Sequence, residues 1–221
     1  SAYFRRHFMA PLVAAVWSCD PHLAMHYPAR YLFAFLDHHG MLRIFGSPRW
    51  RTVTGGSQVY VDRVAAAVEA RGGRVLLDTK VTSVAEGDDG VWITDGNGTE
   101  RRFDQVVIAA HPEQALSMLA QPTSLQTELL TAMPYSANLA QLHTDTSLLP
   151  RNRGAWASWN HLERPGAEGV TVTYDLTRLM RLPTQTRYLV TLGAPDLVDP
   201  DAVIATRDYA HPVYTPASVA A

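Results

Sequence analysis

The sequence predicts a mixed α/β protein in which helical and strand-rich regions follow one another. Residues 1–50 are rich in aromatic side chains and helix formers, residues 50–112 alternate between helical and strand patterns, and strand patterns dominate after residue 135. A chain of 221 residues can bury a sizeable core, either as one large domain or as two small lobes. Its 47% apolar and 18% charged residues are typical of a folded globular protein.

Two helices are predicted in the N-terminal region. The first covers residues 2–18. The second begins at Pro28, which suits a first helical turn, and ends near Gly40, which suits a helix stop. We expect the apolar faces of both helices to pack into one core. The residues expected there are Phe4, Phe8, Leu12, Tyr31, Phe35 and Leu36.

From residue 54 to residue 77 the pattern predicts a turn, a helix and a strand. A Thr-Gly-Gly-Ser turn leads into an apolar stripe with helical spacing, and the helix stops at Gly72 and Gly73. The stripe consists of Val61, Val64, Ala65 and Val68. Residues 74–77 follow directly as a short apolar strand.

The next part predicts an antiparallel meander and then a buried strand. Residues 81–85, 91–94 and 99–103 alternate between apolar and polar side chains and are joined by polar, glycine-containing turns. Residues 105–110 form a continuous apolar run, which is typical of a parallel strand buried on both faces. The run ends at His111 and Pro112, where a new helix can start.

The remaining chain predicts two short helices within residues 113–135 and a strand-rich region after them. A further short helix is expected after Asp199, a good helix cap that is followed by proline. The expected strands cover residues 137–143, 154–160, 169–174 and 187–192.

Charge and cysteine content exclude several classes of protein. The formal net charge is −2 and the basic residues are scattered, so we expect no nucleic-acid partner. The single cysteine, Cys19, rules out an internal disulfide and fits a reducing compartment, with the cytoplasm as the default. The most apolar stretch, residues 8–17, is too short to span a membrane, and we expect neither a span nor a signal peptide. The oligomeric state is left open.

Histidine and serine positions offer little for metal or hydrolase chemistry. The pairs at 22 and 26 and at 38 and 39 lack carboxylate or cysteine partners at ligand spacing, so we expect no metal. Ser57 and Ser158 do not occur in a nucleophile-elbow pattern. His111 and His143 are candidate general bases, and the alternative for each is a structural, hydrogen-bonded histidine.

Three segments together carry a family resemblance. They are residues 50–57 (Trp-Arg-Thr-Val-Thr-Gly-Gly-Ser), the strand at 81–84 and the strand end at 106–112. They resemble the middle of flavin-containing amine oxidases. The whole chain more closely resembles bacterial predicted NAD/FAD-binding, amine-oxidase-like dehydrogenases, with further support from residues 135–150, 155–160 and 208–212.

This resemblance implies a division of the chain and a reaction. Residues 51–116 would be part of an incomplete Rossmann-like FAD-binding lobe that carries the meander. Residues 1–50 and 117–221 would supply the helices and a mixed β-sheet of the substrate lobe. The cofactor would be FAD, and a hydride would pass from a small or lipid-like substrate to flavin N5.

The resemblance also implies site residues. Val81 would offer its backbone to the adenine, and the small side chains at the end of the 105–110 strand would let the chain approach the dinucleotide. Cofactor contacts are expected at Gly55, Gly56, Ser57, Val81, Ala109, Ala110 and Pro112. Walls of a substrate pocket are expected at Trp50, Trp156, Trp159 and Asn160. The alternative for these residues is ordinary helix capping and core packing.

Two departures from the family pattern shape the expected function. The chain contains no Gly-x-Gly-x-x-Gly turn to hold a pyrophosphate, so we expect these 221 residues alone to bind FAD weakly or not at all. The only lysine is Lys80, and the strand at 137–144 carries none, so amine oxidation is not implied. Two alternatives are a non-catalytic or degenerate flavoprotein-fold module and a flavin-dependent desaturase or isomerase.

Overall fold

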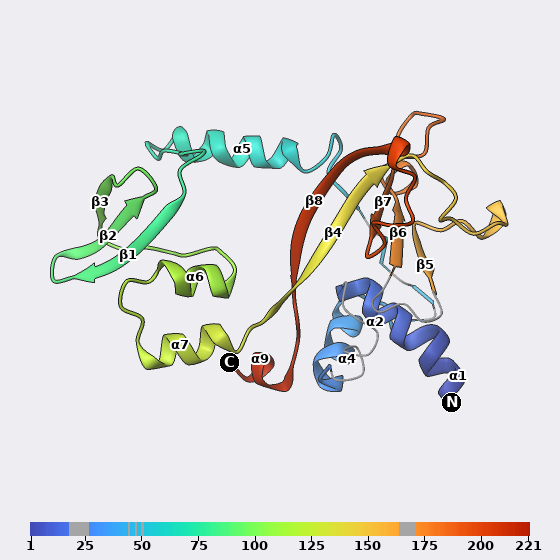
Figure 1. Ribbon diagram of the computed structural model, residues 1–221, viewed down its shortest axis with the longest axis horizontal. Coiled ribbons are helices and arrows are strands. Elements are labelled where there is room, and N and C mark those ends of the chain that lie inside the picture. Colours follow the sequence, from blue (N-terminus) through green and yellow to red (C-terminus); the bar gives the residue numbers. More distant parts are fainter. Residues whose placement is uncertain (18–26, 44, 47, 50, 164–170) are drawn as a thin grey trace. The chain divides into compact units, whose positions relative to one another are not determined.

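A computed structural model describes residues 1–17, 27–43, 45–46, 48–49, 51–163 and 171–221 (Figure 1). The chain forms two compact units. The sheet unit contains Ser1–Gly46 and Tyr135–Val219, and the meander unit contains Ser47–Pro134 with the last two residues. The meander unit therefore includes residues 117–134, which the sequence assigned to the substrate lobe, and the roles of the two units remain predictions.

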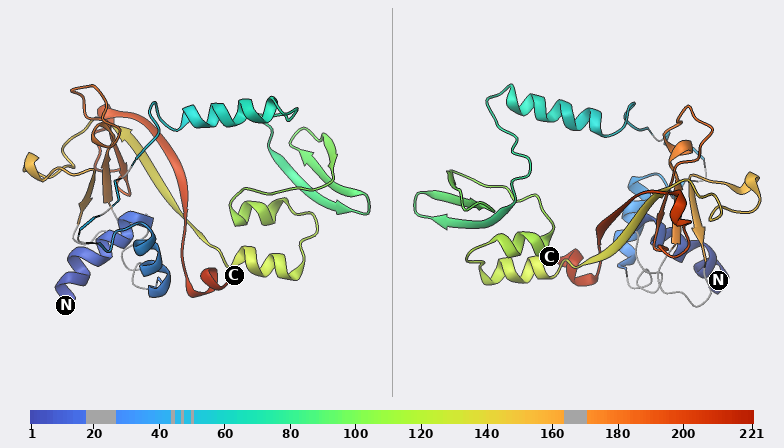
Figure 2. Two further views of the ribbon diagram at one scale, coloured as in Figure 1. Left: turned by 180° about the vertical axis from the view of Figure 1, so that it is seen from behind. Right: turned by 45° about the horizontal axis from the view of Figure 1, so that its top comes forward.

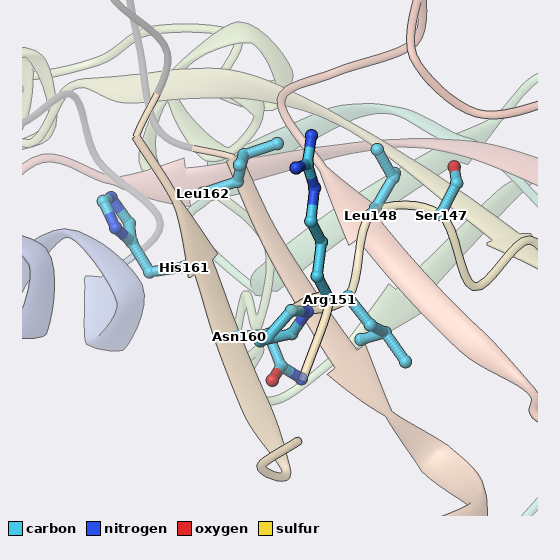
Figure 3. A pocket seen from close by; sticks show the side chains of 8 residues that line it. Ser147, Leu148, Arg151, Asn160, His161 and Leu162 are labelled. Atoms are coloured by element: carbon cyan, nitrogen blue, oxygen red, sulfur yellow. The ribbon is translucent and has the colours of Figure 1, made fainter. Parts of the chain in front are cut away.

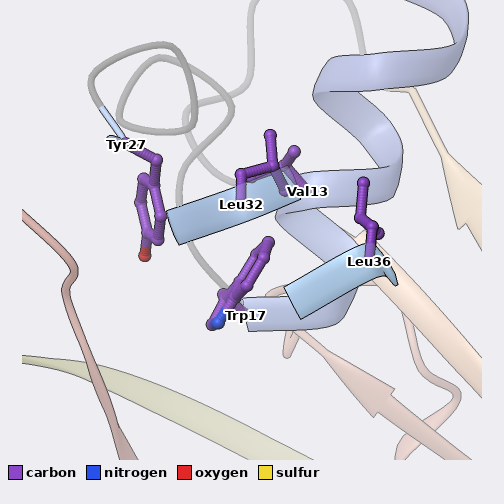
Figure 4. Close-up of a cluster of buried hydrophobic side chains, with 5 residues drawn as sticks. All are labelled: Val13, Trp17, Tyr27, Leu32 and Leu36. Atoms are coloured by element: carbon purple, nitrogen blue, oxygen red, sulfur yellow. The ribbon is translucent and has the colours of Figure 1, made fainter. Parts of the chain in front are cut away.

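The N-terminal helices form where the sequence predicts them. The helix α1 (Ala2–Phe4), the π-helical turn η1 (Arg5–Met9) and α2 (Ala10–Trp17) follow one another without a break, and α4 covers Ala29–His38. Their core consists of Val13, Trp17, Tyr27, Leu32 and Leu36 (Figure 4). The aromatic ring of Tyr214, from far along the chain, packs against this cluster.

For two of the six residues that were expected in the core of these helices, the prediction of burial is wrong. Leu36 is buried, and Leu12, Tyr31 and Phe35 pack against the cluster as half-buried side chains. Phe4 and Phe8 are instead about half exposed, at 49% and 53%, and their rings stack on each other 5.1 Å apart. They lie one helical turn apart, so they cover each other and not the core.

The sheet unit is built on five antiparallel strands in the order β5-β6-β7-β4-β8. The strands are β4 (Tyr135–His143), β5 (Trp159–Leu162), β6 (Thr171–Asp175), β7 (Leu189–Leu192) and β8 (Val203–Pro212). The predicted class, an α/β protein, is confirmed, but this sheet is antiparallel throughout and not mixed. Figures 1 and 2 show β4 and β8 running side by side along their length.

Short elements join these strands. The 3₁₀ turn η2 (Arg153–Ala155) replaces the first half of the strand expected at 154–160, and α8 (Leu176–Leu179) was not predicted. The helix expected after Asp199 is the 3₁₀ turn η3 (Pro200–Ala202), which the Asp199 side chain caps through the amide of Asp201. The helix α9 covers Pro216–Ala220.

The three-stranded meander of the other unit is confirmed. Its strands are β1 (Val81–Gly87), β2 (Gly90–Asp95) and β3 (Glu100–Phe103), paired in that order. Gly90 has a φ of +141°, and a Cβ there would lie 2.5 Å from the Phe103 carbonyl oxygen. Only glycine fits that close approach between strands.

Three helices complete the meander unit: α5 (Gln58–Glu69), α6 (Pro112–Met118) and α7 (Ser124–Thr131). The helix α7 begins with a capping box between Thr123 and Gln126. The helix α6 packs against β1, where Ala115 and Val84 are buried. Among the described residues, no helix has both the length and the apolar character needed to cross a membrane.

The strands expected at residues 74–77 and 105–110 do not form. Residues 74–77 and 105–109 belong to no strand, and Leu77 and Val107 are 78% and 91% exposed. A strand buried on both faces needs a hydrogen-bonded neighbour, and no described residue pairs with these stretches as a strand. The helix α5 forms as predicted, yet none of its residues is buried and its stripe residue Val64 is 60% exposed.

Candidate functional site

The predicted cofactor residues before α5 form a left-handed glycine turn. Gly55 and Gly56 have φ values of +85° and +89°, and the Gly56 amide donates to the Val53 carbonyl over 3.1 Å. Both positions favour glycine, as the resemblance suggested. Ser57 occupies the cap of α5, but its side chain makes no capping hydrogen bond. The turn therefore presents exposed backbone at the start of the helix.

Val81 begins the edge strand of the meander. It pairs with Asp95, and the register shifts between Val81 and Ser83, which marks a bulge at this end of β1. β1 is paired with β2 alone among the described strands, so no strand covers its outer edge at Val81. Further along the same strand the Val84 carbonyl accepts from the Ala120 amide over 2.9 Å, and the contact of Val81 with a planar base remains a prediction.

The remaining predicted cofactor residues surround the start of α6. Ala109 and Ala110 are exposed, and Pro112 occupies the first turn of the helix, which suits its missing amide hydrogen. His111 takes the cap position with extended backbone and makes no side-chain cap hydrogen bond. No hydrogen bond among the described residues connects this segment with Val81 or with the glycine turn, so the cofactor contacts remain predictions.

The predicted pocket tryptophans lie in different settings. Trp50 lies outside the described residues. Trp156 donates its indole N–H to the Pro150 carbonyl over 2.7 Å, and the guanidinium groups of Arg153 and Arg187 lie 5.5 and 5.7 Å from its ring centroid. Trp159 is 45% exposed at the start of β5 and meets Tyr174 edge-on. Trp156 thus fixes the conformation of its own loop.

Asn160 is buried and fully engaged by the backbone. Its Oδ1 accepts from the Ala157 amide over 3.0 Å, and its Nδ2 donates to the carbonyls of Ala157 and Thr173 over 2.8 and 3.3 Å. These three bonds hold the turn before β5 against β6. The amide is therefore a rigid part of the wall and not a free donor for a ligand.

A cavity of about 260 Å³ lies beside β5. Figure 3 shows the Arg151 side chain running between Leu148 and Leu162, whereas the His161 ring points away on the other side of the strand. The lining residues are Ser147, Leu148, Leu149, Pro150, Arg151, Asn160, His161 and Leu162. Of the four predicted pocket residues, this cavity includes Asn160. The loop at 147–151 was not among the predicted site residues.

A chain of buried polar side chains crosses the middle of the five-stranded sheet. His143 Nε2 lies 2.8 Å from Thr191 Oγ1, which lies 2.8 Å from Thr173 Oγ1. Burial lowers the pKa of His143, with the negative charge of Asp145 acting against this effect. The imidazole is fully buried and its Nδ1 has no hydrogen-bond partner in the described chain. A role as general base remains a prediction, and the geometry supports the structural alternative.

The histidine pair at 38 and 39 lies at the end of α4. His39 Nδ1 lies 2.8 Å from the Phe35 carbonyl at the end of α4, next to His38. His22 and His26 lie outside the described residues. In the described ranges, no group of three or more histidine, cysteine, aspartate or glutamate side chains could hold a metal ion.

Comparison with known proteins identifies a family. Residues 1–198 match the family model of flavin containing amine oxidoreductases. No curated protein sequence is significantly similar to the chain. This match confirms the resemblance to flavin-containing amine oxidases. That resemblance rested on residues 50–57, 81–84 and 106–112.

Solved structures with a similar fold include a fatty acid isomerase from P. acnes that produces CLA. It is 15% identical with a TM-score of 0.47, and the similarity covers 72% of this chain and 40% of that one. A single and a triple mutant of putrescine oxidase each show 15% identity and a TM-score of 0.40, covering 76% of this chain and 31% of theirs. The chain therefore spans less than half the length of these structures.

Proposed function

The chain belongs to the flavin containing amine oxidoreductases, and from this membership we propose that it is the central portion of an FAD-dependent oxidoreductase. When bound, FAD would supply the hydride acceptor at flavin N5. The family match over residues 1–198 is the observation that carries the proposal. We further propose a cytoplasmic location, since the only cysteine, Cys19, fits a reducing compartment.

The meander unit would hold part of the cofactor. The left-handed turn at Gly55 and Gly56 leaves backbone free of Cβ atoms at the start of α5, which suits close approach by a nucleotide. Val81 would offer edge-strand backbone to the adenine. Ala109, Ala110 and Pro112 would let the chain pass near the dinucleotide, and the exposed alanines support this because nothing in the described chain covers them.

The sheet unit would hold and orient the substrate. The apolar cavity at β5 supports a small or lipid-like substrate more than an amine, because Arg151 places a positive charge at its wall. The lack of a lysine on β4 agrees with this choice, since Lys80 is the only lysine. We therefore propose oxidation, desaturation or isomerisation of a neutral or acidic substrate, and the contacts of Trp50, Trp156 and Trp159 with it remain predictions.

The visible absorption spectrum of the protein that contains this chain tests the proposal. It should carry flavin as purified or take up added FAD, and a substrate should bleach the flavin band under anaerobic conditions. Lipid, carboxylic acid and amine substrates would be compared in parallel. A protein that neither carries nor takes up flavin would refute the assignment.

A non-catalytic module is the second candidate, because the two stretches expected to be Rossmann-like strands, residues 74–77 and 105–109, belong to no strand and expose Leu77 and Val107. In that case the protein would stabilise a partner without redox turnover. The same spectrum decides between the two, since the module would remain colourless in the presence of FAD. The 221-residue chain alone should bind FAD weakly or not at all, so the spectrum is recorded on the protein that contains it.

A further inference from the structure

Arg151 lies at the β5 cavity without a charged partner in the described chain. The acidic side chains nearest along the sequence are engaged elsewhere. Glu163 pairs with Arg6 over 2.9 Å, and Asp145 accepts the backbone amides of Ser147 and Asp199 over 2.8 and 3.1 Å. The guanidinium of Arg151 makes no hydrogen bond or ion pair with any described residue. Its donors are therefore available to a ligand.

The other arginines near this loop are used differently. Arg187 pairs with the buried Asp175 over 3.0 Å, and Arg178 donates to the Trp156 carbonyl over 2.7 Å. Arg153 lies over the Trp156 ring and does not line the cavity. Arg151 is thus distinguished from its neighbours both by its place at the cavity and by its lack of a partner.

The walls around Arg151 are mostly apolar. The apolar residues that line the cavity are Leu148, Leu149, Pro150 and Leu162. Of these, Leu149 is buried, with 5% of its surface exposed. Figure 3 shows the guanidinium end of Arg151 beside Leu148 and Leu162. A planar guanidinium binds a carboxylate through two parallel hydrogen bonds. The aliphatic side chains beside it can pack against an apolar chain attached to that carboxylate.

The cavity is also held in shape before any ligand arrives. The Leu149 amide donates to the Thr146 carbonyl over 3.1 Å, and the Trp156 indole holds the Pro150 carbonyl on the other side of the loop. Asn160 fixes the opposite wall through its three backbone hydrogen bonds. A preformed site loses less conformational entropy on binding than a loop that must first become ordered.

We propose that this cavity binds a small carboxylic acid with a short aliphatic chain, its carboxylate on Arg151 and its chain against Leu148 and Leu162. A volume of about 260 Å³ is slightly below the roughly 300–1,000 Å³ of typical ligand pockets, so the ligand is short. The proposal names the ligand class of the cavity that the proposed function gives to the substrate, and in this respect it rests on that proposed function, but the binding itself requires no flavin. A cationic amine of the same length is excluded by the charge of Arg151.

Isothermal titration of the 221-residue chain with hexanoate tests the proposal, with acetate, hexanol and hexylamine as comparisons. Hexanoate should bind saturably and more tightly than acetate or hexanol, and hexylamine should not bind. Replacement of Arg151 by glutamine, R151Q, should weaken hexanoate binding at least about tenfold, since a charged hydrogen bond is lost. The matched control R153Q removes a neighbouring arginine outside the cavity and should leave the affinity unchanged.

Three results would overturn the proposal. They are equal binding of hexanol and hexanoate, equal effects of R151Q and R153Q, and the absence of saturable hexanoate binding by a chain with a native thermal transition. Because Arg151 is exposed and has no described partner, R151Q should melt at the wild-type temperature, which separates loss of binding from loss of fold. No flavin takes part, so failure here leaves the flavoprotein proposal open to its own test.

Discussion

His143 Nε2 lies 2.8 Å from Oγ1 of Thr191, between the adjacent strands β4 and β7. Both side chains are buried, and the Thr191 hydroxyl also reaches Thr173 on β6. Three neighbouring strands are therefore joined by side chains as well as by their backbones. Polar groups at such depth stabilise a fold when they are paired and destabilise it when a partner is removed.

The first prediction concerns pH. Burial lowers the pKa of His143, and it does the same for His161 and His211. Each histidine binds a proton more readily in the unfolded chain, where its pKa is about 6.5. Stability should be complete above that pH and should decrease as the pH falls through the lowered folded values. Thermal unfolding at a series of pH values between about 7.5 and 5 measures the effect.

The variant H143Q isolates the part of this pH dependence that belongs to one residue. His161 and His211 still titrate in it, so its melting temperature should fall with pH less steeply than that of the wild type. Identical slopes for the two proteins would contradict the prediction. Urea unfolding at two pH values provides an independent check.

The second prediction concerns the Thr191 hydroxyl. Replacement of Thr191 by valine keeps the shape but leaves His143 Nε2 and the Thr173 hydroxyl without this partner, so it should cost about 1–3 kcal/mol of unfolding free energy. The matched control is Thr206→Val on β8, where the side chain is exposed and the change should stay within about 0.5 kcal/mol. Chemical denaturation of both variants measures the difference. Equal stabilities would show that the buried chain of hydroxyls contributes nothing.

The third prediction compares two glycines of the meander. Gly90 and Gly98 both have positive φ, but a Cβ at Gly90 would lie 2.5 Å from the Phe103 carbonyl, whereas one at Gly98 meets nothing within 4 Å. Gly90→Ala should therefore destabilise the meander by clearly more than Gly98→Ala, which carries only backbone strain of about 1 kcal/mol. Hydrogen exchange of the β1 to β3 amides reports the local stability. Similar exchange rates in the two variants would disprove the steric account.

The fourth prediction concerns the exposed apolar side chains of the meander unit. Leu77→Asp and Val107→Asp should leave the thermal stability of the chain within about 0.5 kcal/mol of the wild type, because both side chains already face solvent. Both should lower the fluorescence of a bound hydrophobic dye. The control Val84→Asp buries a charge beside α6 and should unfold the meander. A large loss of stability in either exposed variant would mean that these residues are covered in solution.

The sequence predicted elements whose determinants are local. The meander was found because its glycine-containing polar turns separate alternating strands, and the start of α6 because His111 and Pro112 follow the apolar run. The apolar run at 105–110 was misread because it indicates burial against a neighbour and cannot show that the neighbour is present. β8 was missed because an edge strand without a buried residue lacks an apolar alternation.

The candidate site was predictable only in part. The turn at Gly55 and Gly56 carries a conformational signature that sequence can show, and the resemblance pointed to Asn160, which does line the cavity. The resemblance could not show that the amide of Asn160 is already engaged. Arg151 was missed because one arginine in a polar loop has no signature, and its lack of a partner is a property of the three-dimensional arrangement alone.

The meander unit buries few apolar side chains, and this determines where the molecule should unfold and be cleaved first. Among its described residues, Val84 and Ala115 are the only apolar side chains that are buried. This burial is far too small to offset the entropy of ordering so long a stretch of chain. A protease added under native conditions should therefore cut first around α5 and the exposed stretches next to it. It should leave fragments in which the pairing of β4 with β8 survives digestion.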